Sequence, residues 1–304
     1  MKNKLNVLPE NPEEEKGVGR FPSWLHRNLP RGGTLAQTGE LLKKYGLNTV
    51  CEEAKCPNRL ECYAKKTATF LAMGKECTRN CGFCDIDFSK TPKAPEEDEP
   101  DRIALAVQEL GLRHVVITMV ARDDLEDQGA AHIGKIIREI RRVNGECAIE
   151  VLTSDFEGKE DSLDTVLAEK PEIFNHNLET VERLTPRVRH KATYQRTLSV
   201  LDYVAKSGKA RYIKSGIMVG LGETQEEVFA TIRDLQKVGV NIITIGQYLQ
   251  PNRRKLLVKE FVTPEIFKAY EEYGREIGIS YMHCGPFVRS SYNAKEVCAT
   301  LSQV

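Results

Sequence analysis

The chain has 304 residues, of which 40% are hydrophobic, 29% charged and 7% aromatic, as expected for one large α/β domain or two ordinary ones. Lysine plus arginine and aspartate plus glutamate both number 44, so the zero net charge does not favour a nucleic-acid partner. No apolar run of about 18 residues predicts a membrane span, and the polar N-terminus lacks a signal segment. We therefore expect a cytoplasmic protein with neither a nucleic-acid nor a membrane partner.

The N-terminal part contains the first of two cysteine groups. Residues 1–20 are polar and contain proline, which predicts an arm, and Gly32-Gly33 predict a flexible point. Short helical stretches are expected over residues 34–66. These stretches contain three cysteines spaced CxxxxCxxxxxC, namely Cys51, Cys56 and Cys62.

The second cysteine group directly follows the first predicted strand. The β-branched and apolar run "TATFLAM" (67–73) predicts that strand, and it leads into "ECTRNCGFCDI". This stretch contains three cysteines spaced CxxxCxxC, namely Cys77, Cys81 and Cys84. The acidic loop at 91–101 is expected to be solvated and to lead into a helix N-terminus.

Beyond this loop, strand-like and helix-like segments alternate. Apolar runs predict strands at residues 114–120, 148–153, 172–178, 212–221 and 241–249. Amphipathic periodicity predicts helices at residues 132–143, 161–169, 196–206, 224–239 and 263–278. Strands that alternate with helices imply parallel pairing and right-handed crossovers. We expect an α/β fold in the form of a partial (β/α)6 TIM-like barrel, with a flat doubly wound sheet as the alternative; both bind ligands at the carboxyl ends of strands.

Six cysteines within 34 residues indicate metal binding, and an odd total of nine argues against a disulfide framework. Structural zinc prefers four ligands from paired CxxC or CxxH elements, which neither group supplies. A [4Fe–4S] cluster accepts one thiolate per iron. Three cysteines therefore leave one iron open to a substrate or cofactor. The other cysteines are expected to be buried and chemically quiet: Cys147, Cys284 and Cys298.

The CxxxCxxC pattern resembles the radical SAM superfamily. It follows a strand, has Phe83 before its third cysteine and precedes alternating strands and helices. The resemblance implies that the open iron binds the amino and carboxylate groups of S-adenosylmethionine (SAM). One electron from the cluster then cleaves the sulfonium to methionine and a 5′-deoxyadenosyl radical.

The two triplets together are similar to those of the lipoyl synthase family. The similarity extends from about Trp24 to Ala294 and includes "ARDDLEDQGA", "NHNLETV", "MVGLGET", "IGQYLQP" and "GPFVRSSYNA". It implies insertion of two sulfur atoms, at C6 and C8, into an octanoyl chain on a lysine of a lipoyl carrier protein. That carrier is a 2-oxoacid dehydrogenase E2 domain or a glycine cleavage H protein.

The same resemblance implies two [4Fe–4S] clusters with different roles. A serine of the Arg289–Tyr292 motif is the expected fourth ligand of the auxiliary cluster, with Ser291 preferred and Ser290 the alternative. This cluster, held by Cys51, Cys56, Cys62 and Ser291, is expected to donate sulfur and to be consumed. The family resemblance therefore also implies an electron donor such as ferredoxin or flavodoxin, and an iron–sulfur carrier that rebuilds the cluster. We expect an arm and auxiliary segment at 1–66, a barrel at 67–250 and an extension with the serine motif at 251–304.

Contacts to SAM are expected from residues near the cysteine loop and after the fourth and fifth strands. Close backbone approach to SAM would suit glycine in the "GLGE" turn, although a full GxGxxG is missing. For the residues after the fourth strand, loop fixing is an equal alternative. The expected contacts are Phe83, Asn175, Asn177, Glu179, Gly220 and Gly222.

Two basic stretches, "RVRHK" (187–191) and "NRRK" (252–255), follow predicted strands. They indicate either a solvated face or a surface that steers an acidic carrier domain. Competing interpretations of the whole chain are a biotin synthase-like or methylthiotransferase-like enzyme and a non-catalytic iron–sulfur carrier. The last predicts four-cysteine closure of both clusters, which the sequence does not offer.

Overall fold

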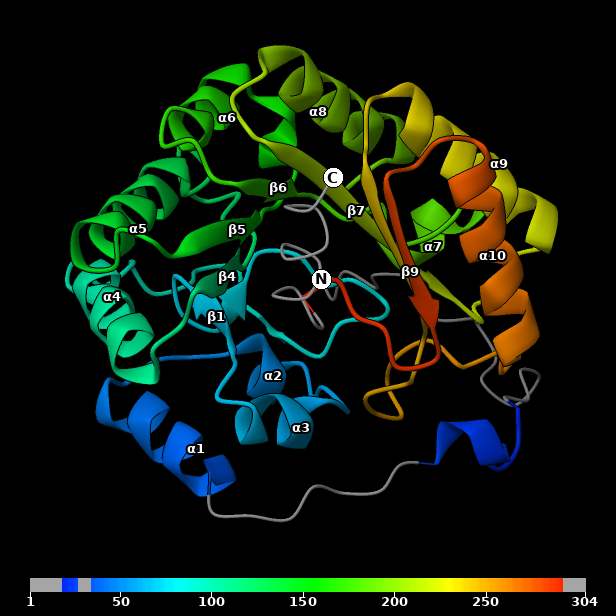
Figure 1. The fold of residues 1–304 in the computed structure, drawn as a ribbon, viewed down its shortest axis with the longest axis horizontal. Coiled ribbons are helices and arrows are strands. Elements are labelled where there is room, and N and C mark those ends of the chain that lie inside the picture. Colours follow the sequence, from blue (N-terminus) through cyan, green and yellow to red (C-terminus); the bar gives the residue numbers. More distant parts are fainter. Residues whose placement is uncertain (1–17, 27–33, 292–304) are drawn as a thin grey trace, which may run out of the picture.

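A curved, seven-stranded parallel sheet forms the centre of the molecule (Figure 1). The computed structural model describes residues 18–26 and 34–291. The strands follow one another across the sheet in chain order: β1 (Thr69–Ala72), β4 (His114–Met119), β5 (Ala148–Leu152), β6 (Ile173–Asn175), β7 (Tyr212–Val219), β8 (Ile242–Gln247) and β9 (Tyr281–Gly285). A doubly wound sheet reverses its strand order at a switch point. The observed order excludes that alternative and confirms the partial barrel.

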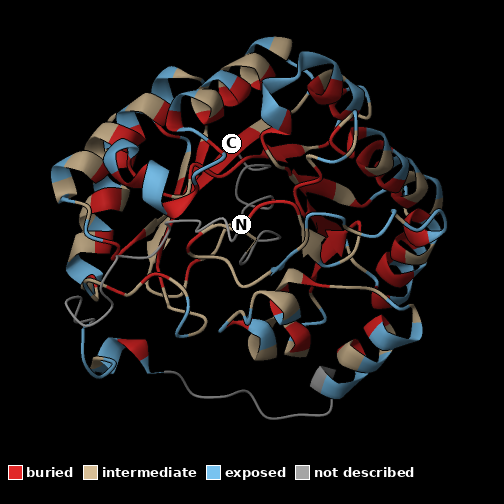
Figure 2. Cartoon of the chain, turned by 180° about the vertical axis from the view of Figure 1, so that it is seen from behind, coloured by how far each residue is buried: buried red, intermediate tan, exposed pale blue. Residues whose placement is uncertain are grey.

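Helices cover the outside of the sheet. The long ones are α4 (Glu99–Leu110), α5 (Ala130–Val143), α6 (Glu160–Leu167), α8 (Tyr194–Ser207), α9 (Gln225–Lys237) and α10 (Pro264–Glu276). Each buries an apolar stripe; that of α5 includes Ile133, Ile136, Ile137 and Ile140. Figure 2 shows buried residues along the strands and exposed ones on the outer helix faces. Short helical turns occur at η2 (Phe156–Gly158), η3 (Glu182–Leu184) and α7 (Thr185–Val188).

The predicted strands and helices are confirmed, with differences at their ends, whereas β9 and the short pair β2 (Glu76–Cys77) and β3 (Asp87–Phe88) were not predicted. The capping box of α9 forms, with Thr224 and Glu227 bonding each other's backbone. The fourth predicted strand is shorter than expected, since β6 ends at Asn175 and the chain then enters a loop. Strand β9 was not predicted, because "YMHCG" contains no β-branched residue and no regular alternation.

The N-terminal segment lies against the β1 side of the barrel (Figure 1). It contains α1 (Thr34–Lys44), α2 (Val50–Glu53) and α3 (Arg59–Ala64). The Leu71 amide donates to the Asn48 carbonyl at 2.9 Å, which joins this segment to β1. The short stretch before η1 (Ser23–Leu25) contacts residues 258–261, where Phe21 and Phe261 pack with ring centroids 5.4 Å apart. Among the described helices, none has the length and apolarity to cross a membrane.

Some predicted features fall outside the described residues. These are the N-terminal arm up to residue 17, Gly32-Gly33, Tyr292 of the serine motif, Cys298 and the end of the C-terminal extension.

Candidate active site

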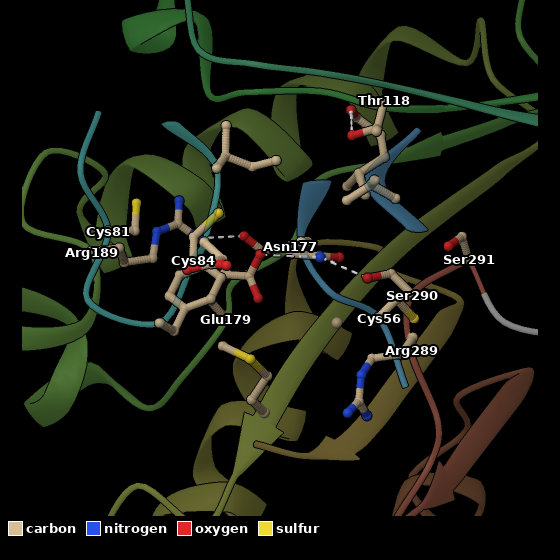
Figure 3. A pocket seen from close by; sticks show the side chains of 18 of the residues that line it. Cys56, Cys81, Cys84, Thr118, Asn177, Glu179, Arg189, Arg289, Ser290 and Ser291 are labelled. Atoms are coloured by element: carbon tan, nitrogen blue, oxygen red, sulfur yellow. Dashed lines mark hydrogen bonds between the residues drawn. The ribbon is translucent and has the colours of Figure 1, made fainter. Parts of the chain in front are cut away.

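A cavity of about 540 Å³ opens at the carboxyl ends of the strands, where ligands bind in such barrels. Residues from both cysteine groups line it, together with the two serines after β9. Figure 3 shows Cys81, Cys84 and Arg189 on one side and Cys56, Ser290 and Ser291 on the other. Parts of the chain that are far apart in sequence therefore share one chamber.

The second cysteine triplet begins at Cys77, the last residue of β2 (Glu76–Cys77), and continues in the loop that leads to β3 (Asp87–Phe88). All three of its cysteines line the cavity. The Gly82 amide donates to the Val188 carbonyl at 2.9 Å, and the Leu256 amide donates to the Gly82 carbonyl at 3.0 Å. A side chain at Gly82 would come within 3.0 Å of Leu256, so glycine permits this close approach. Two other segments thus fix the shape of the cysteine loop.

Burial disfavours free thiolates in this triplet. Burial raises the pKa of the Cys81 thiol to about 11 and that of Cys84 to about 12, and it also raises the pKa of Cys77. Iron binding would compensate for this desolvation by stabilising the thiolates and releasing protons. Within the described residues, no three His, Cys, Asp or Glu side chains converge as ligands of a single ion. A cubane does not need such convergence, because each thiolate binds a different iron.

The first triplet lies on two short helices and the turn between them. Cys51 is in α2, Cys56 follows it and Cys62 is in α3. Cys56 lines the cavity, whereas Cys51 and Cys62 are not among its lining residues. Burial is the main reason that the pKa of Cys51 is raised to about 12 and that of Cys62 to about 11. Charge on Cys56 also raises both pKa values, so the three thiols are neighbours.

The two serines after β9 have different surroundings. The Asn177 amide donates to the Ser290 hydroxyl at 2.8 Å. Within the part of the chain that the structure describes, the Ser291 hydroxyl has no hydrogen-bond partner, and both serines line the cavity. The buried Asn58 amide donates to the Phe287 carbonyl at 2.7 Å. This bond joins the first triplet's segment to the serine segment across 229 positions of sequence.

Three of the predicted SAM contacts reach the cavity, namely Phe83, Asn177 and Glu179. Asn177 donates to Glu179 at 3.1 Å as well as to Ser290 (Figure 3). Glu179 has a left-handed φ of 71°. Burial raises the pKa of its carboxyl, and Arg189 acts in the opposite direction.

Asn175, Gly220 and Gly222 are not among the residues that line the cavity. Asn175 lies beneath it, where its amide donates at 3.1 Å to Glu150, a fully buried carboxylate that also pairs with Lys214 at 2.8 Å. The turn that contains Gly220 and Gly222 closes on its own Glu223, which accepts from the Gly220 and Leu221 amides.

The glycines that do reach the cavity are Gly216 in β7 and Gly246 in β8. A side chain at Gly216 would come within 2.8 Å of Thr244 and 2.9 Å of Asn177. At Gly246 it would meet the Val288 carbonyl. Both therefore allow close packing beside the cavity, and neither was singled out from sequence.

Sequence reasoning missed Arg189 as a cavity residue. It belongs to the basic stretch 187–191, whose pattern indicates a surface, yet it is 5% exposed and lines the cavity. Its guanidinium donates to the Asn177 carbonyl and, at 3.0 Å, to Thr197. Burial lowers its pKa, and Glu179 counteracts this.

A buried ion-pair group behind the second triplet was also missed. Arg79, between Cys77 and Cys81 in sequence, lies 2.7 Å from both Asp123 and Asp155. The side chains of all three are at most 9% exposed. Their carboxylates follow β4 and β5, so the pairing anchors the cysteine loop to the barrel. The available signal was an arginine within CxxxCxxC and acidic residues after strands.

Comparisons with known proteins agree with this geometry. Residues 71–235 match the model of the radical SAM superfamily. The chain is 64% identical to the lipoyl synthase of Protochlamydia amoebophila, over 99% of this chain and 95% of that protein. It is 51% identical to the lipoyl synthase of Chlamydia muridarum, over 98% and 97% respectively. A crystal structure of Streptococcus suis SuiB bound to S-adenosylmethionine has a TM-score of 0.57 at 12% identity, covers 75% of this chain and 54% of that chain, and shares the fold.

Proposed function

Since the chain belongs to the lipoyl synthase family of the radical SAM superfamily, we propose that its two cysteine triplets divide the reaction between them. The enzyme is a sulfurtransferase that inserts two sulfur atoms into the octanoyl group of a lipoyl carrier protein, using SAM and [4Fe–4S] clusters. When bound, these groups supply the one-electron chemistry and the sulfur that side chains cannot provide. The protein's own contribution is to hold the cofactors, to orient the substrate and to exclude water.

The second triplet holds the cluster whose open iron binds SAM. Three observations support this assignment: all three of its thiols face the cavity, Phe83 is beside them, and Asn177 and Glu179 lie on the same wall. Phe83 packs against the adenine, and the two polar side chains hydrogen-bond the ribose or methionyl groups. Asn175, Gly220 and Gly222 do not line the cavity, so they do not contact SAM in this proposal.

The first triplet and Ser291 hold the auxiliary, sulfur-donating cluster. Ser290 already accepts a hydrogen bond from Asn177, which favours Ser291 as the ligand. A serine oxygen is a harder and less well matched ligand for iron than thiolate, so this ligand exchanges most easily. We keep the three functional segments 1–66, 67–250 and 251–304, although β9 of the last one pairs with β8 in the barrel sheet.

The carrier domain docks beside the cavity mouth, where Gln250 and Pro251 line the cavity. The adjoining Arg253 and Arg254 are exposed, whereas Lys255 turns inward to Asn80 at 3.2 Å. An exposed pair of arginines suits an acidic partner surface by steering its association. The specific partners in this proposal are an E2 domain or H protein as carrier, ferredoxin or flavodoxin as reductant, and an iron–sulfur carrier for cluster repair. We place the enzyme in the cytoplasm.

The observation that carries the proposal is a cavity lined by Cys56 of the first triplet and by all three cysteines of the second. The test incubates the anaerobically reconstituted protein with SAM, a reductant and an octanoylated carrier domain, followed by mass spectrometry of the modified lysine. A product with two added sulfur atoms is expected. If 5′-deoxyadenosine forms but no sulfur is added, the assignment of the first triplet is wrong.

A further inference from the structure

The two cysteine segments are joined by one ion pair at the cavity wall. Lys55 directly precedes Cys56, and Asp85 directly follows Cys84. The Lys55 ammonium lies 2.7 Å from an oxygen of the Asp85 carboxylate, and both residues line the cavity. A single contact therefore connects the backbone beside one thiol of each triplet.

Asp85 depends on its partners, because its side chain is only 8% exposed. A buried carboxylate is unfavourable unless it is paired and hydrogen-bonded. Besides Lys55, it accepts a hydrogen bond from the Asn252 amide, in the loop after β8. The Asn252 side-chain oxygen in turn accepts from the Arg254 amide at 2.7 Å. Lys55, Asp85 and Asn252, here called the junction, thus join three segments of the chain.

The backbone at Lys55 indicates that its position is constrained. Its φ is 49°, in the left-handed region that disfavours residues other than glycine and asparagine. Such a conformation persists where the surroundings over-determine it. Here the Lys55 amide donates to the Glu52 carbonyl at 3.0 Å and the Cys56 amide donates to the Cys51 carbonyl at 3.2 Å. The side chain, although 60% exposed, is directed by this turn towards Asp85.

We propose that Lys55 is a positioning residue that sets the separation of the two triplets through Asp85. This rests on the proposed function, in which a carbon made reactive beside one triplet must meet sulfur held by the other. Reacting atoms need near-contact geometry, and a misplacement of about 1 Å can cost on the order of 100-fold in rate. Loss of the junction should therefore uncouple SAM cleavage from sulfur insertion.

The test compares Lys55→Gln, Lys55→Arg and Lys55→Gly in the fully loaded enzyme. The activity readout is the ratio of 5′-deoxyadenosine formed to sulfur inserted, and a second readout is hydrogen exchange of the amides in residues 49–62. We expect K55Q to raise the ratio about tenfold, to speed exchange and to retain SAM cleavage, while K55R stays near wild type. K55G removes backbone strain as well as the charge, so it should behave like K55Q.

Lys66→Gln is the matched control, because Lys66 is also an exposed lysine with a left-handed φ, of 55°, in the same segment. It should change neither readout. Asp85→Asn combined with K55Q should be no worse than Asp85→Asn alone, as expected for one shared interaction.

Unchanged ratio and exchange in K55Q, or wild-type behaviour in K55G, would overturn the role of the ion pair. A wild-type enzyme that cleaves SAM without inserting sulfur would instead contradict the proposed function. The exchange measurement does not depend on that outcome, so the two failures are distinguishable.

Discussion

A single amide group, that of Asn177, distinguishes the two serines after β9. It donates to Ser290 at 2.8 Å and to Glu179 at 3.1 Å, so it ties the serine segment to the loop after β6. A hydroxyl that already accepts a hydrogen bond from a protein group is less available to iron than Ser291, which has no such bond from any residue that the structure describes. Sequence similarity already favours Ser291 over Ser290, and the Asn177 contact supports the same preference.

Ser291→Ala should therefore lower sulfur insertion by about 100-fold, in the range seen when metal-site groups are lost, while SAM cleavage continues. Ser290→Ala, the matched control, should lose far less because Asn177 can still bond Glu179. Lipoyl product and 5′-deoxyadenosine are quantified from the same reactions. The reverse ranking of the two variants would assign the ligand to Ser290.

Buried His176 should give the protein a distinct acid sensitivity. Its ring nitrogens lie 2.9 Å from the Thr153 carbonyl and 3.2 Å from the Thr197 hydroxyl. Burial, followed by the charge of Arg189, lowers its pKa from 6.5 to about 4. The unfolded chain thus binds a proton first as pH falls. The contribution of neutral His176 to stability is fully present above pH 6.5 and is lost towards pH 4, at about 1.4 kcal/mol per pH unit.

His176→Gln should flatten the pH dependence of the free energy of unfolding between about pH 6.5 and 4.5, measured by anaerobic urea denaturation of the cluster-free chain. Asp155 does not contribute to the pH dependence in this range. Its pKa is lowered from 3.8, against burial, chiefly by Arg79, so its contribution is present above that value and is lost only at lower pH. An equal slope in variant and wild type would show that His176 is not the responsible group.

At the level of elements, the cysteine loop is held by the ends of two strands. Asp123 follows β4 and Asp155 follows β5, and both pair with Arg79 inside the loop. Breaking a buried pair leaves an uncompensated charge, which costs about 3–5 kcal/mol. The loop therefore depends on Arg79 for its shape before any cluster is bound.

Arg79→Met should lower the free energy of unfolding by about 3 kcal/mol and should reduce the iron held by the second triplet. Arg79→Lys keeps the charge but loses the forked geometry, so an intermediate result is expected. Iron is measured per chain after anaerobic reconstitution, beside thermal denaturation. Full iron content in Arg79→Met would mean that the loop is shaped by other contacts.

The sequence predicted elements well where local signals were strong. The Thr224 capping box and the apolar stripe of α5 were both predictable from sequence, because a few adjacent residues determine them. Strand β9 was not predictable from sequence, since it forms by pairing with β8 and its own composition gives no strand signal. The same reason explains Arg189. Its basic sequence context suggests an exposed side chain, but tertiary packing buries it.

For the molecule as a whole, the partial barrel brings remote segments to one end. The Asn58–Phe287 hydrogen bond and the Lys55–Asp85 pair are examples that no local pattern could predict. The fully buried Glu150 of β5 and Lys214 of β7 also pair across the sheet, at 2.8 Å. Both cysteine triplets and the serine motif were candidates from sequence because they resemble those of a known family. Only the fold shows that Cys56, the second triplet and the two serines line one cavity.

The carrier-docking proposal belongs to this scale. Reversal of Arg253 and Arg254 to Glu should raise the KM for the octanoylated carrier about tenfold at low ionic strength and weaken its salt dependence. Turnover of a short octanoyl-lysyl peptide should hardly change, because the cavity itself is untouched. Equal losses with carrier and peptide would mean that these residues shape the active site instead.

The division of labour between the triplets is tested most directly by replacing each with alanine and measuring iron and 5′-deoxyadenosine together. Wild type should hold about eight irons per chain, as two cubanes require, and each triple variant about half. Replacing Cys77, Cys81 and Cys84 should abolish SAM cleavage. Replacing Cys51, Cys56 and Cys62 should preserve SAM cleavage and abolish sulfur insertion. Full iron content in either variant, or loss of cleavage in the second, would contradict the assignment.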